Sequence, residues 1–456
     1  MTGTDPTSEA SPWPARWLAC RTARVVSTAA CCAIVGWSVY STIRLHDSPG
    51  EPTRRFRDFY EFFAGAEALV RGNDIFAAGD LGYIYPPLLA TLLMPLVHLG
   101  MPAAATAWVL LNGLLLGASA WLGSRVVAAR LGLSKNLAPV IALIALAILS
   151  DKIISDMRMQ QTNMLMLACW SVGLWAIGSH PLRGGLGLSL AANIKYITAI
   201  TLPYFLIRGR WKDAAAFLGG FLFWAVLPAV FIGWDRNLSI WQGAVGGLVS
   251  SSAPGTPIAG EARVMSTRDF GVSVSTAMVR AADAMGKPQL APVLSAAALA
   301  AVFVAAWILY HRSGQPMWRG RFGAAERSRP RLVLVEFIGL IVVALAFSPQ
   351  TNTRHFVQAL PLGMLLAAPL VSASQTRTRL LALAGITIWW LRLILPPAGT
   401  APALIRAWHN SGGICLSMVV GWLFALGAVL REEGTTPGKS NPASSQAAPT
   451  PQTASP

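Results

Sequence analysis

One carboxylate in the sequence stands among arginines, just after the first apolar segment. Asp58 lies in RRFRDFYEF, close to Arg54, Arg55 and Arg57. A carboxylate beside cations stays ionised and can act as a general base that removes a proton from a reacting hydroxyl. The same pattern fits an ion-pair cluster that only anchors the loop. Asp58 is therefore a candidate catalytic base with a structural alternative.

Three cationic residues later in the chain are candidates for binding an anion. Arg354 and His355 lie in SPQTNTRHF between two apolar segments, where they can bind a phosphate or sugar or be solvated loop residues. Lys195 lies in the middle of the apolar segment 184–207. An ammonium near the bilayer centre costs about 2.5–3.5 kcal/mol on insertion scales, so it is usually functional or paired. Lys195 is thus a substrate ligand, or it snorkels or pairs with Glu336.

Polar residues without charge complete the set of candidates. Gln161 and Asn163 open an apolar segment and can hydrogen-bond sugar hydroxyls, or cap the helix that follows. Tyr60 and Tyr85 can line a sugar site, although aromatic residues near a membrane interface more often serve as anchors. The sequence contains no phosphate-binding loop, dinucleotide fingerprint or metal-ligand spacing, and its five cysteines form no such spacing. We therefore expect no cofactor and no metal ion.

The elements that must position these residues are membrane helices. Of the 456 residues 54% are hydrophobic and only 12% are charged, and the mean hydropathy is +0.52, which excludes an ordinary soluble domain. Apolar segments recur along the chain at spacings suited to membrane spans. Candidate spans run near 19–43, 103–124, 137–149, 163–178, 214–234, 291–310, 332–348, 356–372, 379–396 and 413–430.

The charge of the loops sets the expected topology. The segment 184–207 is too short for two full crossings, but one crossing would put basic loops on both sides of the membrane. A hairpin of two shorter helices restores agreement with the excess of Lys and Arg in inner loops. We therefore expect an all-α integral membrane protein with about twelve transmembrane helices and both termini cytoplasmic. Most of the net charge of +16 then lies in inner loops, so it reports orientation and not nucleic-acid binding.

The same topology divides the chain into regions. The first outer loop, at 44–102, holds two expected interfacial helices, because Phe59, Phe62, Phe63 and Leu69 recur at helical spacing and a short apolar stretch follows from Tyr83. The expected regions are a cytoplasmic segment at 1–18, a membrane domain at 19–430 with a second large outer loop at 235–290, and a disordered cytoplasmic tail at 431–456. The expected location is a bacterial plasma membrane.

Several blocks of sequence resemble glycosyltransferase family 87. They are Asp58-Phe59-Tyr60, LVRGNDIF, YIYPPLLATLLMPLVHLG, QQTNMLMLACW, GGLGLSLAANIKYITAITLPYFLIRGRWKDA and SPQTNTRHF, in the family's order, over about residues 56 to 370. The third block is similar to the family's Y-P-P-L motif, the fourth to its G-Q-x-N helix start and the last to its S-P-x-x-x-x-H loop. Gln160 stands where the family has glycine.

The resemblance implies a fold and an activity. The fold would be that of type C glycosyltransferases, with an active site at the outer membrane face. The donor would be a sugar on a polyprenyl phosphate, mannose in the actinobacterial α-mannosyltransferases that build phosphatidylinositol mannosides and arabinofuranose in a related branch. The partners would be this donor, a glycolipid or glycan acceptor and membrane lipid. By position in the family, Asp58 would be the base of an inverting transfer.

Two other readings of the sequence remain open. A transporter or flippase of lipid-linked sugars would also show about twelve helices and buried charge, but it commonly has repeated halves, and the sequence shows no repeat. A family member that has lost activity and acts as a membrane partner is a further alternative. The retained Asp58 argues against it.

Overall fold

The computed structural model describes most of the chain. The described residues are 20–47, 50–51, 55–80, 82–250, 271–315, 317, 329–372 and 403–435. All regular secondary structure within these ranges is helical. The prediction of an all-α protein is therefore confirmed for this part of the chain.

Within each described range, the helices follow one another with short connections. Several begin with a proline in the first turn, where its missing N–H group costs no intrahelical hydrogen bond. The elements are α2 (Arg21–His46), α4 (Asp58–Arg71), α5 (Pro87–Val97), α6 (Met101–Arg130), η1 (Lys135–Leu137), α7 (Ala138–Ile148), α8 (Ser150–Met159), α9 (Asn163–Ala176), α10 (Pro181–Ile194), η2 (Tyr196–Ile200), α11 (Thr201–Ile207), α12 (Trp211–Val226), α13 (Ala229–Ile232), α14 (Trp234–Ser250), α15 (Val274–Ala284), η3 (Pro288–Leu290), α16 (Ala291–Arg312), α18 (Pro330–Phe347), η4 (Thr353–Ala359), α19 (Leu360–Val371), α21 (Ala403–Asn410) and α22 (Gly413–Thr435).

Seven helices in the described ranges are long and apolar enough to cross a membrane. They are α2, α6, Trp211–Ile232, Pro288–Arg312, α18, Thr353–Val371 and Gly413–Arg431. An eighth crossing is formed if α7 and α8, which meet at a bend of 68°, count as one span. The chain is thus an integral membrane protein, and the expected span at 379–396 lies outside the described residues.

The expected hairpin at 184–207 is present as two helical segments separated at Lys195. Helix α10 ends at Ile194, and Lys195 itself has an extended backbone before η2 begins. The hydroxyl of Thr198 donates to the carbonyl oxygen of Leu188 at 2.9 Å, so the chain folds back along α10. The break places the lysine at a turn between helices and not within one.

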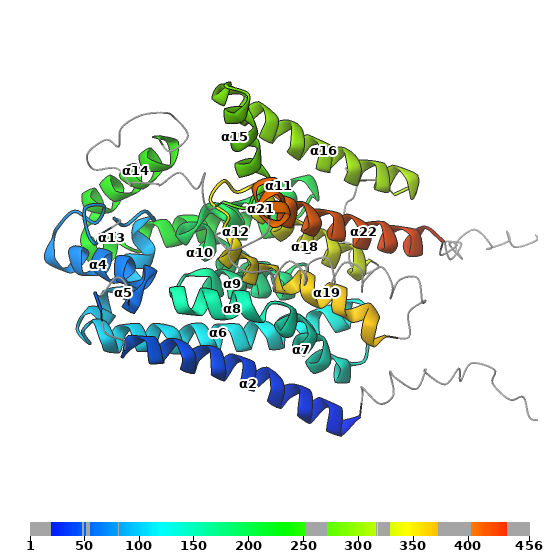
Figure 1. The fold of residues 1–456 in the computed structure, drawn as a ribbon, viewed down its shortest axis with the longest axis horizontal. Coiled ribbons are helices and arrows are strands. Elements are labelled where there is room, and N and C mark those ends of the chain that lie inside the picture. Colours follow the sequence, from blue (N-terminus) through cyan, green and yellow to red (C-terminus); the bar gives the residue numbers. More distant parts are fainter. Residues whose placement is uncertain are drawn as a thin grey trace, which may run out of the picture.

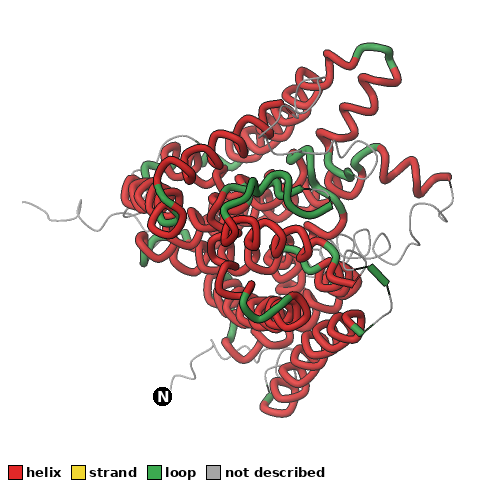
Figure 2. Tube along the Cα trace, turned by 90° about the vertical axis from the view of Figure 1, so that its left-hand side faces the viewer, coloured by secondary structure: helices red, strands yellow, loops and turns green. Residues whose placement is uncertain are grey.

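The first and last described helices reach the same end of the bundle. In Figure 1, α2 begins and α22 ends at the right, whereas α4, α5, α13 and α14 gather at the left. Figure 2 views the molecule from that left-hand end and shows loops crossing the middle of the helices. Loops and short helices therefore concentrate at the end opposite to the start of α2.

Helix α4 is positioned by protein contacts. Its aromatic face, with Phe59, Phe62 and Phe63, is buried, and Phe59 stacks on Trp108 of α6 with 5.7 Å between ring centroids. The expected interfacial helix therefore packs its apolar face on α5 and α6. At its other end, the guanidinium of Arg236 from α14 donates to carbonyl oxygens of the last turn of α4 at 3.0 and 3.2 Å. A cation there also interacts favourably with the helix dipole.

A buried ion pair lies deeper in the bundle. Glu336 of α18 accepts hydrogen bonds from Arg208, Tyr310 and Tyr204, the last at 3.0 Å. Arg208 also donates to the hydroxyl of Tyr310 at 3.0 Å. The suggestion that Lys195 pairs with Glu336 is therefore wrong, because the carboxylate has these nearer partners.

Candidate active site

A large cavity opens beside the N-terminus of α4. It has a volume of about 650 Å³ and receives residues from α4, the loop before α5, the hairpin, α18 and the loop before η4. Its polar residues include Asp58, Gln161, Lys195 and His355. Its apolar residues include Ile194, Ile197, Ile200, Leu299, Val343, Ala344 and Phe347. One cavity thus combines a polar cluster with an aliphatic surface.

Asp58 is the first residue of α4. A carboxylate at this position interacts favourably with the helix dipole. Its Oδ2 accepts a hydrogen bond from the side-chain amide of Gln161 and lies 3.4 Å from Nη1 of Arg354. Its Oδ1 has no hydrogen-bond partner among the residues that the structure describes. One carboxylate oxygen is therefore held in place, and the other remains available to a ligand.

The cation next to Asp58 comes from far away in the sequence. The structural alternative was that its neighbours in RRFRDFYEF pair with it, but Arg55 donates to the carbonyl oxygen of His46 and stacks over Phe56. Burial raises the pKa of Asp58 above its ordinary value of 3.8, and the positive charges of Arg354, Lys195 and Arg57 oppose that rise. The same cations therefore favour the ionised form that a base needs.

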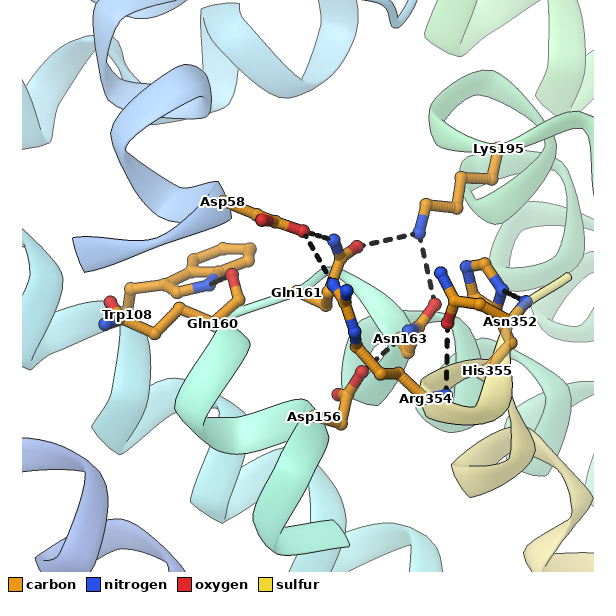
Figure 3. Close-up of polar contacts among 10 residues, drawn as sticks. All are labelled: Asp58, Trp108, Asp156, Gln160, Gln161, Asn163, Lys195, Asn352, Arg354 and His355. Carbon is orange, nitrogen blue, oxygen red and sulfur yellow. Dashed lines mark hydrogen bonds and ion pairs between the residues drawn. The ribbon is translucent and has the colours of Figure 1, made fainter. Parts of the chain in front are cut away.

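Lys195 forms hydrogen bonds with two side-chain amides and lies over one aromatic ring. Its Nζ donates to Oε1 of Gln161 and to Oδ1 of Asn163, each at 3.1 Å (Figure 3). It also lies 5.7 Å from the ring centroid of Tyr85. The suggestion that Gln161 and Asn163 cap the next helix is wrong, because the N-cap of α9 is Thr162, with no side-chain capping bond. Burial raises the pKa of Tyr85, so its hydroxyl stays neutral.

Arg354 and His355 belong to an ordered turn. Asn352 caps η4: its Oδ1 accepts from the backbone N–H of Arg354, and its own backbone N–H donates to Nδ1 of His355, both at 3.1 Å. Because Nδ1 accepts, the proton of the neutral imidazole is on Nε2. Both side chains are half-buried, so the suggestion of solvated loop residues is wrong.

The structure thus brings together seven of the eight candidates. Asp58, Gln161, Lys195, Tyr85 and His355 line the cavity, while Asn163 and Arg354 contact those residues from behind.

Tyr60 is the exception. It does not line the cavity and packs with the apolar cluster of α4 and α5. The described residues contain no group of three His, Cys, Asp or Glu side chains arranged to hold a metal ion.

Two buried residues of the cluster were missed. Asp156 accepts a hydrogen bond from Asn163 at 2.7 Å, and Gln358 donates to Asn163 at 3.2 Å. Asp156 lies in the polar stretch SDKIISDMRM, and Gln358 is four residues after Arg354 at the start of an apolar segment. A polar side chain one helical turn from a candidate is a signal that could have identified Gln358.

A comparison with known protein families shows to which family this chain belongs. A model described as glycosyltransferase family 87 matches residues 83–325, a little over half of the chain. The chain belongs to glycosyltransferase family 87. The matched region contains Tyr85, Gln161, Asn163 and Lys195, whereas Asp58 precedes it and the Arg354–His355 loop follows it.

A similar characterised protein comes from Mycobacterium tuberculosis (strain ATCC 25618 / H37Rv). It is a polyprenol-phosphate-mannose-dependent alpha-(1-2)-phosphatidylinositol mannoside mannosyltransferase, 29% identical over 208 residues. The matched part is 42% of this chain and 48% of the relative. The chain therefore spans about half the length of this family-87 relative.

The local backbone agrees with the family-87 motif at one unusual position. Gln160 has a left-handed conformation with φ of 53°, which glycine adopts without steric cost. Its carbonyl oxygen accepts from the indole N–H of Trp108 at 3.0 Å. This turn between α8 and α9 directs Gln161 toward Asp58 (Figure 3).

Proposed function

We propose that this protein is a membrane glycosyltransferase that uses a polyprenyl-phosphate sugar, with mannose as the favoured sugar. The acceptor is a glycolipid of the phosphatidylinositol mannoside kind or another glycan. Membership of family 87 and the name of the mycobacterial relative support the donor class. The observation that carries the proposal is Asp58, whose Oδ1 is available in a cavity that also holds Lys195 and His355.

The proposed reaction is a single displacement with inversion. Asp58 takes the proton of an acceptor hydroxyl as that oxygen bonds to the anomeric carbon. The bond from that carbon to the phosphate oxygen breaks, and its electron pair leaves with polyprenyl phosphate. General-base catalysis of this kind contributes about 10²–10⁴-fold. Phosphate is already a good leaving group when its charge is balanced, so the site must chiefly supply cations and donors.

The cluster supplies those groups in the proposed reaction. Lys195 and Arg354 provide positive charge, and Nε2–H of His355 provides a neutral donor at the cavity wall. Gln161, Asn163 and Tyr85 contribute polar and aromatic surface for the sugar. The aliphatic residues, among them Ile197 and Phe347, suit the first isoprene units of the donor.

The proposal extends to the architecture and the orientation in the membrane. The fold is that of type C glycosyltransferases with about twelve transmembrane helices, and the reaction occurs at the outer face of a bacterial plasma membrane. The domain divisions at 1–18, 19–430 and 431–456 follow, with cytoplasmic termini. The start of α2 and the end of α22 lie at one end of the bundle, opposite to α4, which supports this orientation.

The test is the Asp58→Asn variant of the purified protein with radiolabelled polyprenyl-phosphate mannose and a phosphatidylinositol mannoside acceptor. We expect transfer to fall by about 10²–10⁴-fold while polyprenyl phosphate binding remains, because only the base is lost. Glu67→Gln is the matched control, since Glu67 lies on the same helix and pairs with Arg71 at the exposed surface. Transfer at the wild-type rate by Asp58→Asn would exclude Asp58 as the base.

A transport function is the second candidate, and one observation favours it. The helical pairs α7–α8 and α10–α11 are both interrupted, and residues of the α10–α11 break line the cavity, as in many transporters. A flippase would move lipid-linked sugar between the leaflets of a reconstituted vesicle without forming a glycosidic bond. Product analysis in the same vesicles separates the two functions.

A further inference from the structure

Asp156 is a buried carboxyl group that the proposed reaction does not use. It lies on α8, is 1% exposed and does not line the cavity. Its Oδ1 accepts from Nδ2 of Asn163 at 2.7 Å, and its Oδ2 has no hydrogen-bond partner among the described residues. Burying a carboxyl group with so few partners is costly, so a specific role is expected.

The hydrogen bonds around Asn163 run in one direction. At one end, the indole N–H of Trp170, which can only donate, bonds to Oε1 of Gln358 at 3.2 Å. The amide nitrogen of Gln358 must therefore face Asn163, whose Oδ1 accepts from it at 3.2 Å. At the other end, Oδ1 of Asp156 accepts from the amide nitrogen of Asn163. Both ends of the series thus select the same orientation of the Asn163 amide.

The orientation of the Asn163 amide determines which of its atoms faces Lys195. Oδ1 of Asn163 accepts from the Lys195 ammonium at 3.1 Å. If the amide were reversed, its NH₂ group would face both the ammonium and the NH₂ group of Gln358. Removing the acceptor at Asp156 removes the bond that holds the amide against such a reversal.

The second amide next to Lys195 is arranged in the same way. Gln161 accepts from Lys195 through its oxygen and donates through its nitrogen to Asp58. The lysine is therefore linked to one carboxyl group at the cavity and one behind it, each through a single amide (Figure 3). Asp156 occupies in the second branch the place that Asp58 occupies in the first.

We propose that Asp156 is a positioning residue, which fixes the Asn163 amide and thereby holds Lys195 in place to bind the phosphate group of the donor. The binding part of this inference rests on the proposed function. Asp156 does not line the cavity, so it acts through Asn163.

The first test measures binding of polyprenyl phosphate to the full-length protein in lipid nanodiscs. Asp156→Leu is expected to weaken binding by about tenfold to a hundredfold, the value of a hydrogen bond to a charged group. Asp156→Asn keeps an acceptor oxygen and is expected to bind within about threefold of the wild type. Asp151→Asn is the matched control, because Asp151 lies on the same helix and pairs with Lys152. Equal losses in the Leu and Asn variants would overturn a role as acceptor.

A double-mutant cycle separates positioning from general damage. Because Asp156 acts through Lys195, the double variant Asp156→Leu/Lys195→Met is expected to bind no more weakly than Lys195→Met alone. Losses that multiply would mean that Asp156 acts independently of Lys195, which contradicts the proposal.

A second readout does not depend on the donor. The acylation rate of Lys195 by acetic anhydride, measured by mass spectrometry against Lys212, is expected to change at least about threefold in Asp156→Leu. No change is expected in Asp151→Asn. If wild-type protein binds no polyprenyl phosphate, the proposed function fails, and this rate still decides whether Asp156 positions Lys195. An unchanged rate in Asp156→Leu would overturn the positioning role.

Discussion

Two of the clusters of charged side chains that the described part of the bundle buries are built in opposite ways. In the cluster around Lys195, the ammonium reaches the carboxyl groups of Asp58 and Asp156 only through neutral amides, and the cluster borders a cavity of about 650 Å³. In the other cluster, Arg208 contacts Glu336 directly, and neither residue lines that cavity. Arg208 and Glu336 are 5% and 7% exposed.

This difference distinguishes a binding site from a structural connection. Arg208 has little remaining attraction for a ligand, because Glu336 balances its charge at close range and neither residue lines the cavity. An ammonium that faces amide oxygens is solvated but not neutralised, so it can still attract a phosphate. We infer that the Arg208–Glu336 cluster stabilises the packing of α11, α16 and α18, and the Lys195 cluster performs the chemistry.

The largest predicted effect sharpens this contrast at Asp58. Asp58→Asn is expected to lose about 10²–10⁴-fold in transfer without a lower Tm. Burial raises the pKa of Asp58, so its ionised form costs folding free energy as the pH rises toward neutrality, and the neutral amide removes that cost. Paired measurements of transfer and thermal unfolding check both parts. A large drop in Tm would place Asp58 with the structural residues.

Glu336→Gln should have the opposite profile. Removing one partner of a buried pair leaves Arg208 uncompensated, and the expected loss is about 3–5 kcal/mol of folding free energy. The activity per folded molecule should remain close to that of the wild type. Thermal unfolding in detergent, with transfer normalised to the folded fraction, provides the measurement. A selective loss of turnover at unchanged Tm would break the comparison.

Arg354→Gln tests the cation that contacts Asp58. We expect kcat/KM to fall by about tenfold to a hundredfold, because a charged hydrogen-bonding group is lost near the phosphate. The proposed mechanism requires ionised Asp58, so activity is expected to decline as the pH falls through the pKa of that carboxyl, which burial raises above 3.8 in the wild type. Arg354 holds this pKa down, so the acid limb of the pH profile should move to higher pH in the variant. An acid limb at the same pH in Arg354→Gln and in the wild type would argue against the Asp58–Arg354 interaction.

The smallest effect is predicted for Tyr310→Phe. This change removes one hydroxyl that bonds to both Glu336 and Arg208 but leaves the ion pair intact. The expected loss is about 1–2 kcal/mol in folding free energy, with transfer unaffected. A Tm lowered as much as in Glu336→Gln would show that the hydroxyl and the carboxylate act as one unit.

The sequence predicted the helical class and most of the candidate residues, because both follow from local patterns. Apolar runs identify membrane helices, and the break at Lys195 follows from a charge within such a run. It was less informative where a partner lies far away in the chain. Neighbouring arginines were one alternative for Asp58 and Glu336 was one alternative for Lys195, whereas the structure pairs Asp58 with Arg354 and Glu336 with Arg208. Hydropathy contains no information on which of several cations a carboxylate meets in three dimensions.

The burial of Asp156 could not be predicted from the sequence for a different reason. Nothing in SDKIISDMRM distinguishes its two aspartates, yet Asp151 pairs with the adjacent Lys152 and Asp156 is buried against Asn163. Helix α8 follows α7 at a bend of 68° and packs on α2 and η4, which are distant in the sequence, so a local pattern does not show which aspartate is buried.

The wide separation of the Asp58–Arg354 pair in the chain also has a consequence for biosynthesis. The two residues are 296 positions apart. At about 5–20 residues per second, a ribosome needs about 15–60 s to make the intervening chain. A nascent protein therefore inserts α4 and its carboxylate long before Arg354 is translated, and a polypeptide that stops before η4 has no complete site. The proposed transfer can therefore begin only late in synthesis, when η4 joins the helices inserted earlier.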